Sequence, residues 1–189
     1  MSGMIRQAGE DDISRITEIY ADAVDNGTAT YELEAPDEAE IRSRFRALKA
    51  ANYPYLVYED DGAVLGYAYA GPFRARPAYR FIVEDSIYIA PEAKGRGVGR
   101  ALLEALIEAC RHDGYRQFVA VIGDGVSGSP SVRLHRAVGM RLTGMLEGSG
   151  YKHGRWLDTA FMQMDLNGGA SGPPDPDSVP EKLYQASKR

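Results

Sequence analysis

A glycine-rich segment between a strand pattern and a helix pattern constrains this chain more than any other feature. Residues 94–100 read Lys-Gly-Arg-Gly-Val-Gly-Arg, after the β-rich residues 82–90 and at the start of an apolar helical pattern over 98–112. Glycine lets the backbone approach a ligand closely, and the N–H groups at a helix N-terminus attract anions. The positive side chains around the glycines strengthen that attraction. The segment therefore predicts an anion site suited to a pyrophosphate group.

Two common phosphate-binding motifs fit this segment poorly. A P-loop requires Lys followed by Ser or Thr after its last glycine, whereas Gly99 is followed by Arg100 and Ala101. A Rossmann turn requires a third glycine where Arg100 stands. Residues 123–128 match the Rossmann glycine pattern literally, but too little chain follows them for a second nucleotide-binding half. A plain glycine loop between strand and helix remains the alternative to an anion site.

Charge and composition favour a small anionic ligand over a nucleic acid or a membrane. The chain of 189 residues has a net charge of −5, so the positive segment is local in an acidic protein. The single cysteine, Cys110, excludes an intrachain disulfide and favours a reducing compartment. No apolar run approaches the roughly 18 residues of a membrane span, and no signal-peptide pattern opens the chain. We expect a cytoplasmic protein that binds neither nucleic acid nor membrane.

Hydrophobic periodicity predicts the element order βααβββαβαββ. Strands are expected at residues 4–7, 55–59, 64–70, 82–90, 118–122, 141–147 and 156–166, and helices at residues 13–26, 37–48, 98–112 and 131–138. These elements are expected to form one domain over residues 1–166. Residues 167–189 begin with a stretch rich in glycine and proline, so we expect a flexible C-terminal tail there.

Five further segments resemble a single family, in register with the glycine-rich segment. They are Gly-Pro-Phe-Arg-Ala-Arg-Pro-Ala-Tyr at 71–79, Val-Glu-Asp-Ser-Ile-Tyr-Ile at 83–89, Val-Ala-Val-Ile-Gly at 119–123, Pro-Ser-Val-Arg-Leu-His at 130–135 and Gly-Tyr-Lys-His-Gly-Arg-Trp-Leu-Asp at 150–158. Over residues 4–166 the chain resembles the GNAT acetyltransferases, and among them the N-acetyltransferases of phosphinothricin and of methionine sulfone or sulfoximine. The resemblance implies an α/β (α+β) GNAT fold, whose mixed, mostly antiparallel sheet of about seven strands is flanked by about four helices.

The resemblance also implies an acetyl-CoA-dependent N-acetyltransferase. Its acceptor would be the α-amino group of phosphinothricin or a related amino acid analogue. Transfer would be direct, in a ternary complex, and would use no metal. Because the family is commonly dimeric, a homodimer is implied, with the loop at residues 28–32 reaching toward the partner's active site.

Site residues follow from the same resemblance, position by position. The general base of the family falls on Glu84, and a family histidine falls on His135. The acyl donor is assigned to the backbone of Ile87, Tyr88 and Ile89 and to the loop of Lys94, Gly95, Arg96, Gly97, Val98, Gly99 and Arg100. The acceptor is assigned to Phe73, Arg74, Arg76 and Tyr79, with Glu84, Asp85 and Ser86 beside them. A cofactor-contacting asparagine of the family is absent before residue 130, so Ser129 and Ser131 stand in for it.

The face of the strand on which Glu84 lies determines whether its carboxyl can act as a general base. An amine must lose a proton before it attacks a thioester, and a carboxylate within reach can take that proton. Because side chains alternate along a strand, Glu84 shares a face with Tyr88, and Asp85 faces the other way. Partial burial there would raise the pKa of Glu84 toward neutrality. The alternative is a structural carboxylate paired with Arg76 or Arg80.

Several further roles in the chemistry are less sharply defined by the residues. A backbone N–H, expected at Ile89, would stabilise the negative charge that develops on the thioester oxygen. A histidine on a short helix, such as His135, is more often structural, bonded to the adjacent loop, than catalytic. The histidines lack metal-ligand spacing, and no nucleophile motif surrounds Cys110. Direct attack is therefore favoured over a covalent intermediate.

Three classes of function compete on this sequence. The first is N-acetylation of an amino acid analogue, with Arg74 and Arg76 holding its acidic end. The second keeps the fold but acetylates a protein N-terminus or a polyamine, and a polyamine would need an acidic pocket, which the basic loop at 74–80 disfavours. The third is a non-catalytic acyl-CoA-binding module, which the presence of Glu84 disfavours.

Overall fold

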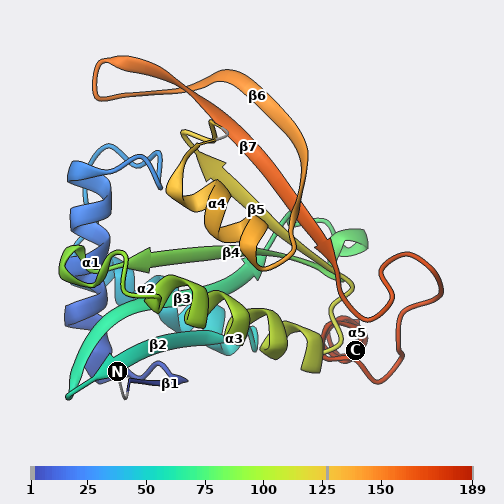
Figure 1. Ribbon diagram of the computed structural model, residues 1–189. Coiled ribbons are helices and arrows are strands. Elements are labelled where there is room, and N and C mark those ends of the chain that lie inside the picture. Colours follow the sequence, from blue (N-terminus) through green and yellow to red (C-terminus); the bar gives the residue numbers. More distant parts are fainter. Residues whose placement is uncertain (1–2, 127, 189) are drawn as a thin grey trace.

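A seven-stranded sheet with helices on both faces makes up the body of the protein (Figure 1). The computed structural model describes residues 3–126 and 128–188. The strands are β1 (Met4–Gln7), β2 (Tyr55–Asp60), β3 (Ala63–Pro72), β4 (Ile82–Ile89), β5 (Gln117–Gly123), β6 (Arg141–Lys152) and β7 (Arg155–Asp165). The α-helices are α1 (Ile13–Asn26), α2 (Glu38–Ala50), α3 (Val98–His112), α4 (Pro130–Ala137) and α5 (Val179–Ala186), with short 3₁₀ helices η1 (Glu10–Asp12), η2 (Pro77–Tyr79) and η3 (Pro91–Ala93).

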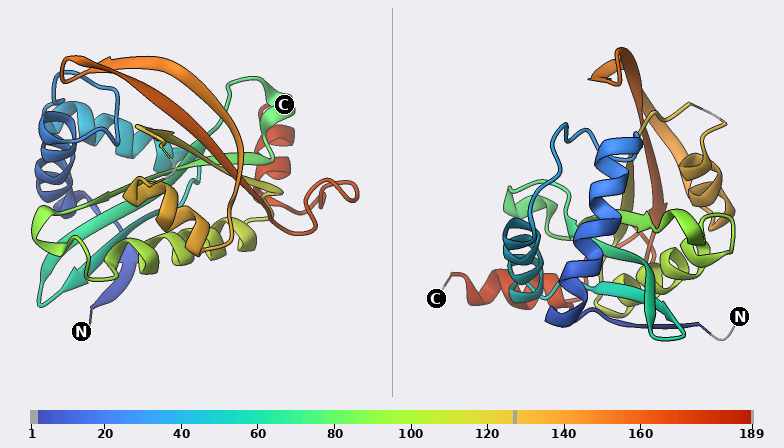
Figure 2. Two further views of the ribbon diagram at one scale, coloured as in Figure 1. Left: turned by 45° about the horizontal axis from the view of Figure 1, so that its top comes forward. Right: turned by 90° about the vertical axis from the view of Figure 1, so that its left-hand side faces the viewer.

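The sheet has the strand order β1-β2-β3-β4-β5-β7-β6, and all neighbours are antiparallel except the parallel pair β4–β5. The mixed, mostly antiparallel sheet expected from the sequence is therefore confirmed. Helices α1 and α2 cover one face, and α3 and α4 cover the other (Figure 2).

Apolar contacts on the two faces of β4 confirm the expected alternation of its side chains. Tyr88 packs edge-on against Tyr20 of α1, with ring centroids 4.9 Å apart. Its neighbour Ile89 points to the opposite face, toward Leu102 of α3. Gly66 of β3 leaves space for the Ile89 and Leu102 side chains, because a Cβ at this position would lie 2.8 Å from Ile89 Cδ1 and 3.3 Å from Leu102 Cδ1. Strand β4 thus presents one set of side chains to α1 and the other to α3.

The parallel pairing between β4 and β5 is short. It joins Ile82 with Gln117, Val83 with Phe118 and Glu84 with Val119, and then it ends. Beyond that point β4 stays paired with β3 as far as Ile89, and β5 stays paired with β7 as far as Gly123. The two halves of the sheet therefore diverge from Glu84 onward, and an opening forms between β4 and β5.

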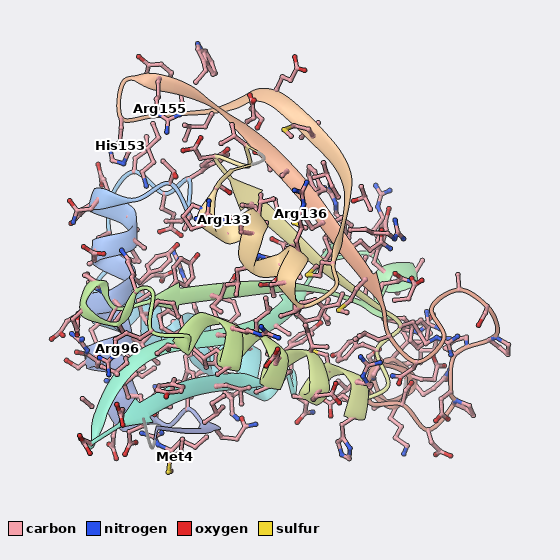
Figure 3. The ribbon with its side chains drawn as sticks, viewed as in Figure 1. Met4, Arg96, Arg133, Arg136, His153 and Arg155 are labelled. Atoms are coloured by element: carbon pink, nitrogen blue, oxygen red, sulfur yellow. The ribbon has the colours of Figure 1, made fainter. Side chains whose placement is uncertain are left out.

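The β6–β7 hairpin is longer than the sequence pattern predicted. A loop was expected over 148–154, but β6 continues to Lys152 and the turn consists of His153 and Gly154 alone. Both turn residues have positive φ, 52° and 74°, which is the geometry of a tight hairpin turn. The glycines of β6 made this stretch resemble a loop. Figure 3 shows His153 and Arg155 at the tip of the hairpin, and Arg155 there forms an ion pair with Asp124.

The C-terminal segment contains a packed helix, whereas the sequence pattern suggested a flexible tail over 167–189. Its N–H group at Val179 donates to the Asp113 carbonyl over 2.9 Å. Arg80, at the end of the loop after β3, lies 2.8 Å from the Glu181 carboxylate and 4.4 Å from the Tyr184 ring centroid. Proline at Pro180 favours a helix start, a local signal that the glycine and proline content of the preceding residues obscured.

We predict that Arg80→Ala releases α5 from the body. The substitution removes the ion pair with Glu181 and the contacts of the guanidinium with Phe81 and Tyr184. Hydrogen exchange of the α5 amides should therefore become several-fold faster, because local opening costs less free energy. Arg111→Ala, which removes an exposed pair with Glu108, is the matched control. Equal protection of α5 in the two variants would contradict this role of Arg80.

Candidate active site

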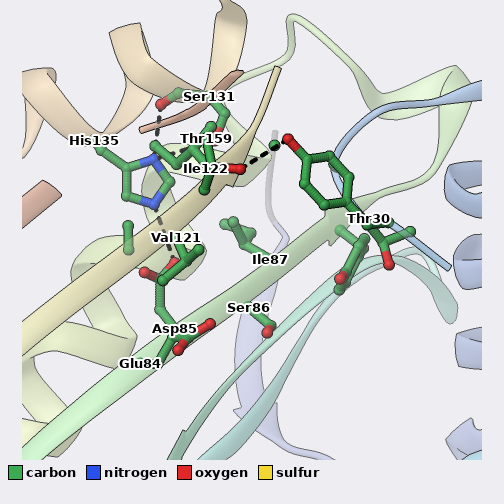
Figure 4. A pocket seen from close by; sticks show the side chains of 15 residues that line it. Thr30, Glu84, Asp85, Ser86, Ile87, Val121, Ile122, Ser131, His135 and Thr159 are labelled. Atoms are coloured by element: carbon green, nitrogen blue, oxygen red, sulfur yellow. Dashed lines mark hydrogen bonds and ion pairs between the residues drawn. The ribbon is translucent and has the colours of Figure 1, made fainter. Parts of the chain in front are cut away.

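The opening between β4 and β5 holds a cavity of about 230 Å³ (Figure 4). Its walls come from segments far apart in the chain. They are Ala29, Thr30 and Tyr31 from the loop after α1, Glu84, Asp85, Ser86, Ile87 and Tyr88 from β4, Ala120, Val121, Ile122 and Gly123 from β5, Ser131 and His135 from α4, and Thr159 from β7. A concave site that gathers hydroxyl, carboxyl and imidazole groups is the natural candidate for an active site.

Glu84 is the titratable group of this cavity that is best suited to accept a proton. It lies at the last β4–β5 pair, where the strands begin to diverge. The pKa of its carboxyl is raised to about 7, chiefly by burial and also by the negative charge of Asp85, while the positive charge of Arg74 opposes the rise. A carboxyl with a pKa near the working pH exchanges protons readily with a bound amine.

The alternative interpretation of Glu84, as a carboxylate paired with Arg76 or Arg80, finds no support in the described part of the chain. Arg80 pairs with Glu181 instead. No ion pair involving Glu84 is present among residues 3–126 and 128–188. Glu84 is therefore not committed to a structural contact with an arginine.

His135 and Asp85 form a buried pair on the wall of the cavity that faces α4. The Nε2 atom of His135 lies 3.1 Å from Asp85 Oδ2, and its Nδ1 lies 2.7 Å from the Ser131 carbonyl oxygen. Burial lowers the pKa of His135, but the charge of Asp85 and the two hydrogen bonds raise it, and the net result lies above the ordinary value. Both ring nitrogens of His135 thus have partners within the protein. This arrangement favours the structural interpretation of His135 over a direct catalytic role.

The loop at residues 27–32 closes one side of the cavity and is held by the β6–β7 hairpin. The Lys152 ammonium donates to the Thr30 carbonyl over 3.0 Å, and His153 Nε2 donates to the Gly27 carbonyl over the same distance. The Tyr31 hydroxyl lies 2.9 Å from Thr159 Oγ1 of β7. The loop therefore lines the cavity of its own chain, and its reach toward the active site of a partner stays a prediction.

The glycine-rich segment forms the turn that the sequence predicted. Gly95 and Gly97 have φ values of +77° and +84°, which side chains rarely allow. Gly97 is the N-cap of α3 and has no side chain to bond the first-turn N–H groups. The turn lies close to the end of β4: a Cβ built at Gly99 would be 3.6 Å from Ile89 Cγ1. Backbone donors are thus presented beside the strand that lines the cavity.

The basic side chains of this segment lie near acidic neighbours. Lys94 lies 3.5 Å from Asp22, Arg96 lies 3.4 Å from Asp60, and Arg100 lies 2.8 Å from Glu104. Val98, the first residue of α3, is in contrast buried. The exposed pairs at Lys94 and Arg100 are weak in water, so these side chains remain free to turn toward an anion.

The other predicted residues divide between the cavity and its surroundings. Ile87, Tyr88, Asp85, Ser86 and Ser131 line the cavity, and Ile89 lies beyond it. The predicted acceptor residues Phe73, Arg74, Arg76 and Tyr79 lie on the loop next to it, where the Phe73 and Tyr79 rings are 6.0 Å apart. Ser129 caps α4 by accepting a hydrogen bond from the Val132 N–H over 3.2 Å. The loop at residues 73–79 therefore does not form the cavity wall, although the charge of Arg74 on this loop acts on Glu84.

Sequence reasoning missed three groups of lining residues. The sequence predicts a strand at residues 118–122 but assigns no site residue to it, although Ala120, Val121, Ile122 and Gly123 line the cavity. Thr159 carries no motif, and the loop residues Ala29, Thr30 and Tyr31 are predicted as a loop without a place in this chain's own site. A signal for β5 is present in the sequence, since Gly123 at the strand end and Gly125 two residues later mark a break in the pattern.

Neither a metal site nor a membrane span is found in the described residues. Within 3–126 and 128–188, no three His, Cys, Asp or Glu side chains gather as metal ligands would. No helix in these ranges is both long and apolar enough to cross a membrane.

Comparison with known proteins places this geometry in a family. The model of the acetyltransferase (GNAT) family matches residues 15–140. A phosphinothricin N-acetyltransferase of Alcaligenes faecalis is 47% identical over 90% of this chain and 86% of that protein. An L-methionine sulfoximine/L-methionine sulfone acetyltransferase of Pseudomonas aeruginosa is 41% identical over 92% of this chain and 100% of that protein.

A solved structure agrees with these relatives. The crystal structure of a GNAT superfamily phosphinothricin acetyltransferase from Sinorhizobium meliloti, in complex with AcCoA, superposes with a TM-score of 0.93. The two sequences are 50% identical, and the match covers 97% of this chain and 99% of that chain. Fold, sequence and family model give the same answer: this chain is an acyltransferase enzyme and belongs to the acetyltransferase (GNAT) family.

Proposed function

We propose that this protein acetylates the α-amino group of phosphinothricin or of a related amino acid analogue, such as methionine sulfone or sulfoximine. The acetyl group comes from acetyl-CoA and passes directly to the amine in a ternary complex. The observation that carries this proposal is the carboxyl of Glu84, which has a pKa of about 7 at the point where β4 and β5 diverge. The named relatives support the choice of acceptor class.

Acetyl-CoA has two elements of the fold available to it. The first-turn N–H groups of α3, together with Lys94 and Arg100, suit its pyrophosphate. The backbone of β4 from Ile87 to Ile89 has no β5 partner, so one edge of the strand is open to the amide groups of the pantetheine arm. The thioester then lies in the opening, near Glu84.

The transfer needs one base and one stabilised oxyanion. The acceptor arrives largely as an ammonium group, and Glu84 takes one of its protons, directly or through a water molecule. The free amine attacks the thioester carbonyl carbon, and a backbone N–H expected at Ile89 stabilises the negative oxygen. As the C–S bond breaks, the nitrogen gives up its second proton and becomes the amide, and the departing thiolate takes up a proton to give CoA. The proton that Glu84 accepted is released to water, so one proton is produced in each turnover.

Positive charge beside Glu84 favours an acidic acceptor. Arg74 and Arg76, on the loop that borders the cavity, are assigned to its carboxylate or phosphinate, for which a guanidinium fork is well matched. A polyamine would meet these charges unfavourably. A protein N-terminus and a non-catalytic acyl-CoA-binding role remain the competing functions, and Glu84 argues against the second.

We also propose a cytoplasmic homodimer. Several large apolar side chains on the β6–β7 hairpin are exposed, among them Trp156 at 67% and Leu146 at 53%. Tyr151 packs edge-on against Trp156, with ring centroids 5.2 Å apart. An exposed apolar patch of this kind is typical of an interface.

Replacing Glu84 by Gln should abolish most of the turnover. We expect kcat to fall by a factor of about 10²–10⁴, because the amine loses its proton acceptor. The affinity for acetyl-CoA should stay within about twofold of that of the wild type, since the pyrophosphate contacts are unchanged. Thiol release should be measured with phosphinothricin, methionine sulfone, methionine sulfoximine, spermidine and a short peptide as acceptors. Glu59→Gln, which removes a strand carboxylate paired with Arg6, is the matched control.

The pH profile of the wild type gives an independent check. Because the ionised form of Glu84 is the base, kcat/KM should fall as the pH drops through about 7. Full activity of Glu84→Gln would remove the base assignment. Tight acetyl-CoA binding without turnover of any acceptor would favour the non-catalytic alternative.

The dimer can be tested by replacing Trp156 with Ser. The substitution removes the largest exposed apolar side chain of the hairpin, so sedimentation should show a shift toward the monomer. Met4→Ser is the control, because Met4 is also exposed but lies on β1, at the opposite edge of the sheet. A wild type that sediments as a monomer would contradict the proposed assembly.

A further inference from the structure

We propose that Asp85 and His135 are a positioning pair, in which the His135 imidazolium holds the negatively charged Asp85 carboxylate in place beside the proton acceptor Glu84. This inference rests on the proposed role of Glu84. It differs from the role that the family resemblance implied for His135, because here the histidine acts through its neighbours and does not touch the substrate.

The contacts of the His135 ring determine where its protons lie. The Ser131 carbonyl, 2.7 Å from Nδ1, can only accept a hydrogen bond. Asp85 Oδ2, 3.1 Å from Nε2, also accepts when it is ionised. With an acceptor on each side, both ring nitrogens must donate, and the ring carries a positive charge. The other state would place the second proton on Asp85 and leave both groups neutral.

Because the pair is buried, its charges act on neighbouring groups with little screening by water. The side chains of His135 and Asp85 are each 2% exposed, so water screens the ion pair poorly. Asp85 Oδ1 has no hydrogen-bond partner among the described residues. A pair kept for stability alone would be expected to satisfy both oxygens, and an unsatisfied buried carboxylate oxygen calls for another explanation. A role in the electrostatics of the cavity supplies one.

The neighbours of the pair and of Glu84 define the local field. Asp85 follows Glu84 directly on β4 and raises its pKa, while Arg74 of the adjacent loop lowers it. Tyr69 of β3 also interacts with Glu84. On the α3 side, the buried thiol of Cys110 feels the charge of Asp85. Among these groups, Asp85 is the negative charge nearest to Glu84 along the chain, and His135 is the hydrogen-bonded partner of Asp85.

The nitrogen NMR spectrum of His135 tests the charge of the pair without any catalytic assay. At about pH 7.5, above the ordinary histidine pKa of roughly 6.5, both ring nitrogens of His135 should still carry protons. His135→Gln identifies the signal by its disappearance. In Asp85→Asn the amide can donate to Nε2, so His135 should become neutral at the same pH. A wild-type Nε2 without a proton would overturn the proposal.

The pH profile tests the coupling to Glu84. Asp85 acts on the pKa of Glu84, whereas His135 is not among the charges that do, so the pKa of Glu84 should fall in Asp85→Asn even though both charges of the pair disappear. The acidic limb of kcat/KM should therefore move to lower pH by about half a unit or more. Asp12→Asn is the matched control: Asp12 is also buried and paired with an arginine, Arg6, on the far side of β3 from β4. Its loss should reduce stability and leave the limb in place.

Two outcomes separate the possible failures. An acidic limb that stays in place in Asp85→Asn, with activity lowered uniformly, would show a merely structural pair and overturn the coupling. If Glu84→Gln also keeps full activity and its acidic limb, the base assignment itself has failed. In that case the NMR result still decides whether the pair is charged.

Discussion

The early end of the β4–β5 pairing is the constraint on which the rest of the site depends. Parallel strands normally pair along their length, yet here the ladder ends at Glu84 and Val119. Each strand keeps its other neighbour, so the sheet stays intact while a cavity opens inside it. The backbone of β4 that faces the opening has no sheet partner there and can bind an extended ligand. Closing this gap would remove the cavity and the environment of Glu84 together.

Burial gives the carboxyl groups at this opening their chemistry. Glu84 is largely removed from water and has no ion pair with any residue that the structure describes, so its charged form is disfavoured and its pKa rises to about 7. Its neighbour Asp85 is buried more deeply, but His135 on the opposite wall supplies a countercharge. Adjacent residues on one strand therefore meet different environments, because alternation sends one toward α1 and the other toward α4. On this difference rests our proposal that Glu84 accepts the proton while Asp85 holds a fixed charge.

The remaining walls depend on contacts between distant segments. The hairpin tip at Lys152 and His153 holds the loop at residues 27–32, and Tyr31 reaches Thr159 of β7. The helix α5 is similarly joined to the loop after β3 through Arg80. Loops on both sides of the cavity are thus positioned by the C-terminal third of the chain. Their place could not be inferred from their own residues.

Local patterns in the sequence determined the order of the elements and the glycine turn before α3. These features depend on neighbouring residues: hydrophobic periodicity sets strands and helices, and glycines at positive φ set the turn. The tertiary structure alone decided the partner of His135, the place of Tyr31 and Thr159, the length of the hairpin and the helix in the tail. Each of these depends on residues far apart in the chain, such as Asp85 with His135, whose distance no local pattern encodes. The pKa of Glu84 belongs to the same class, because it depends on how deeply the fold buries the carboxyl.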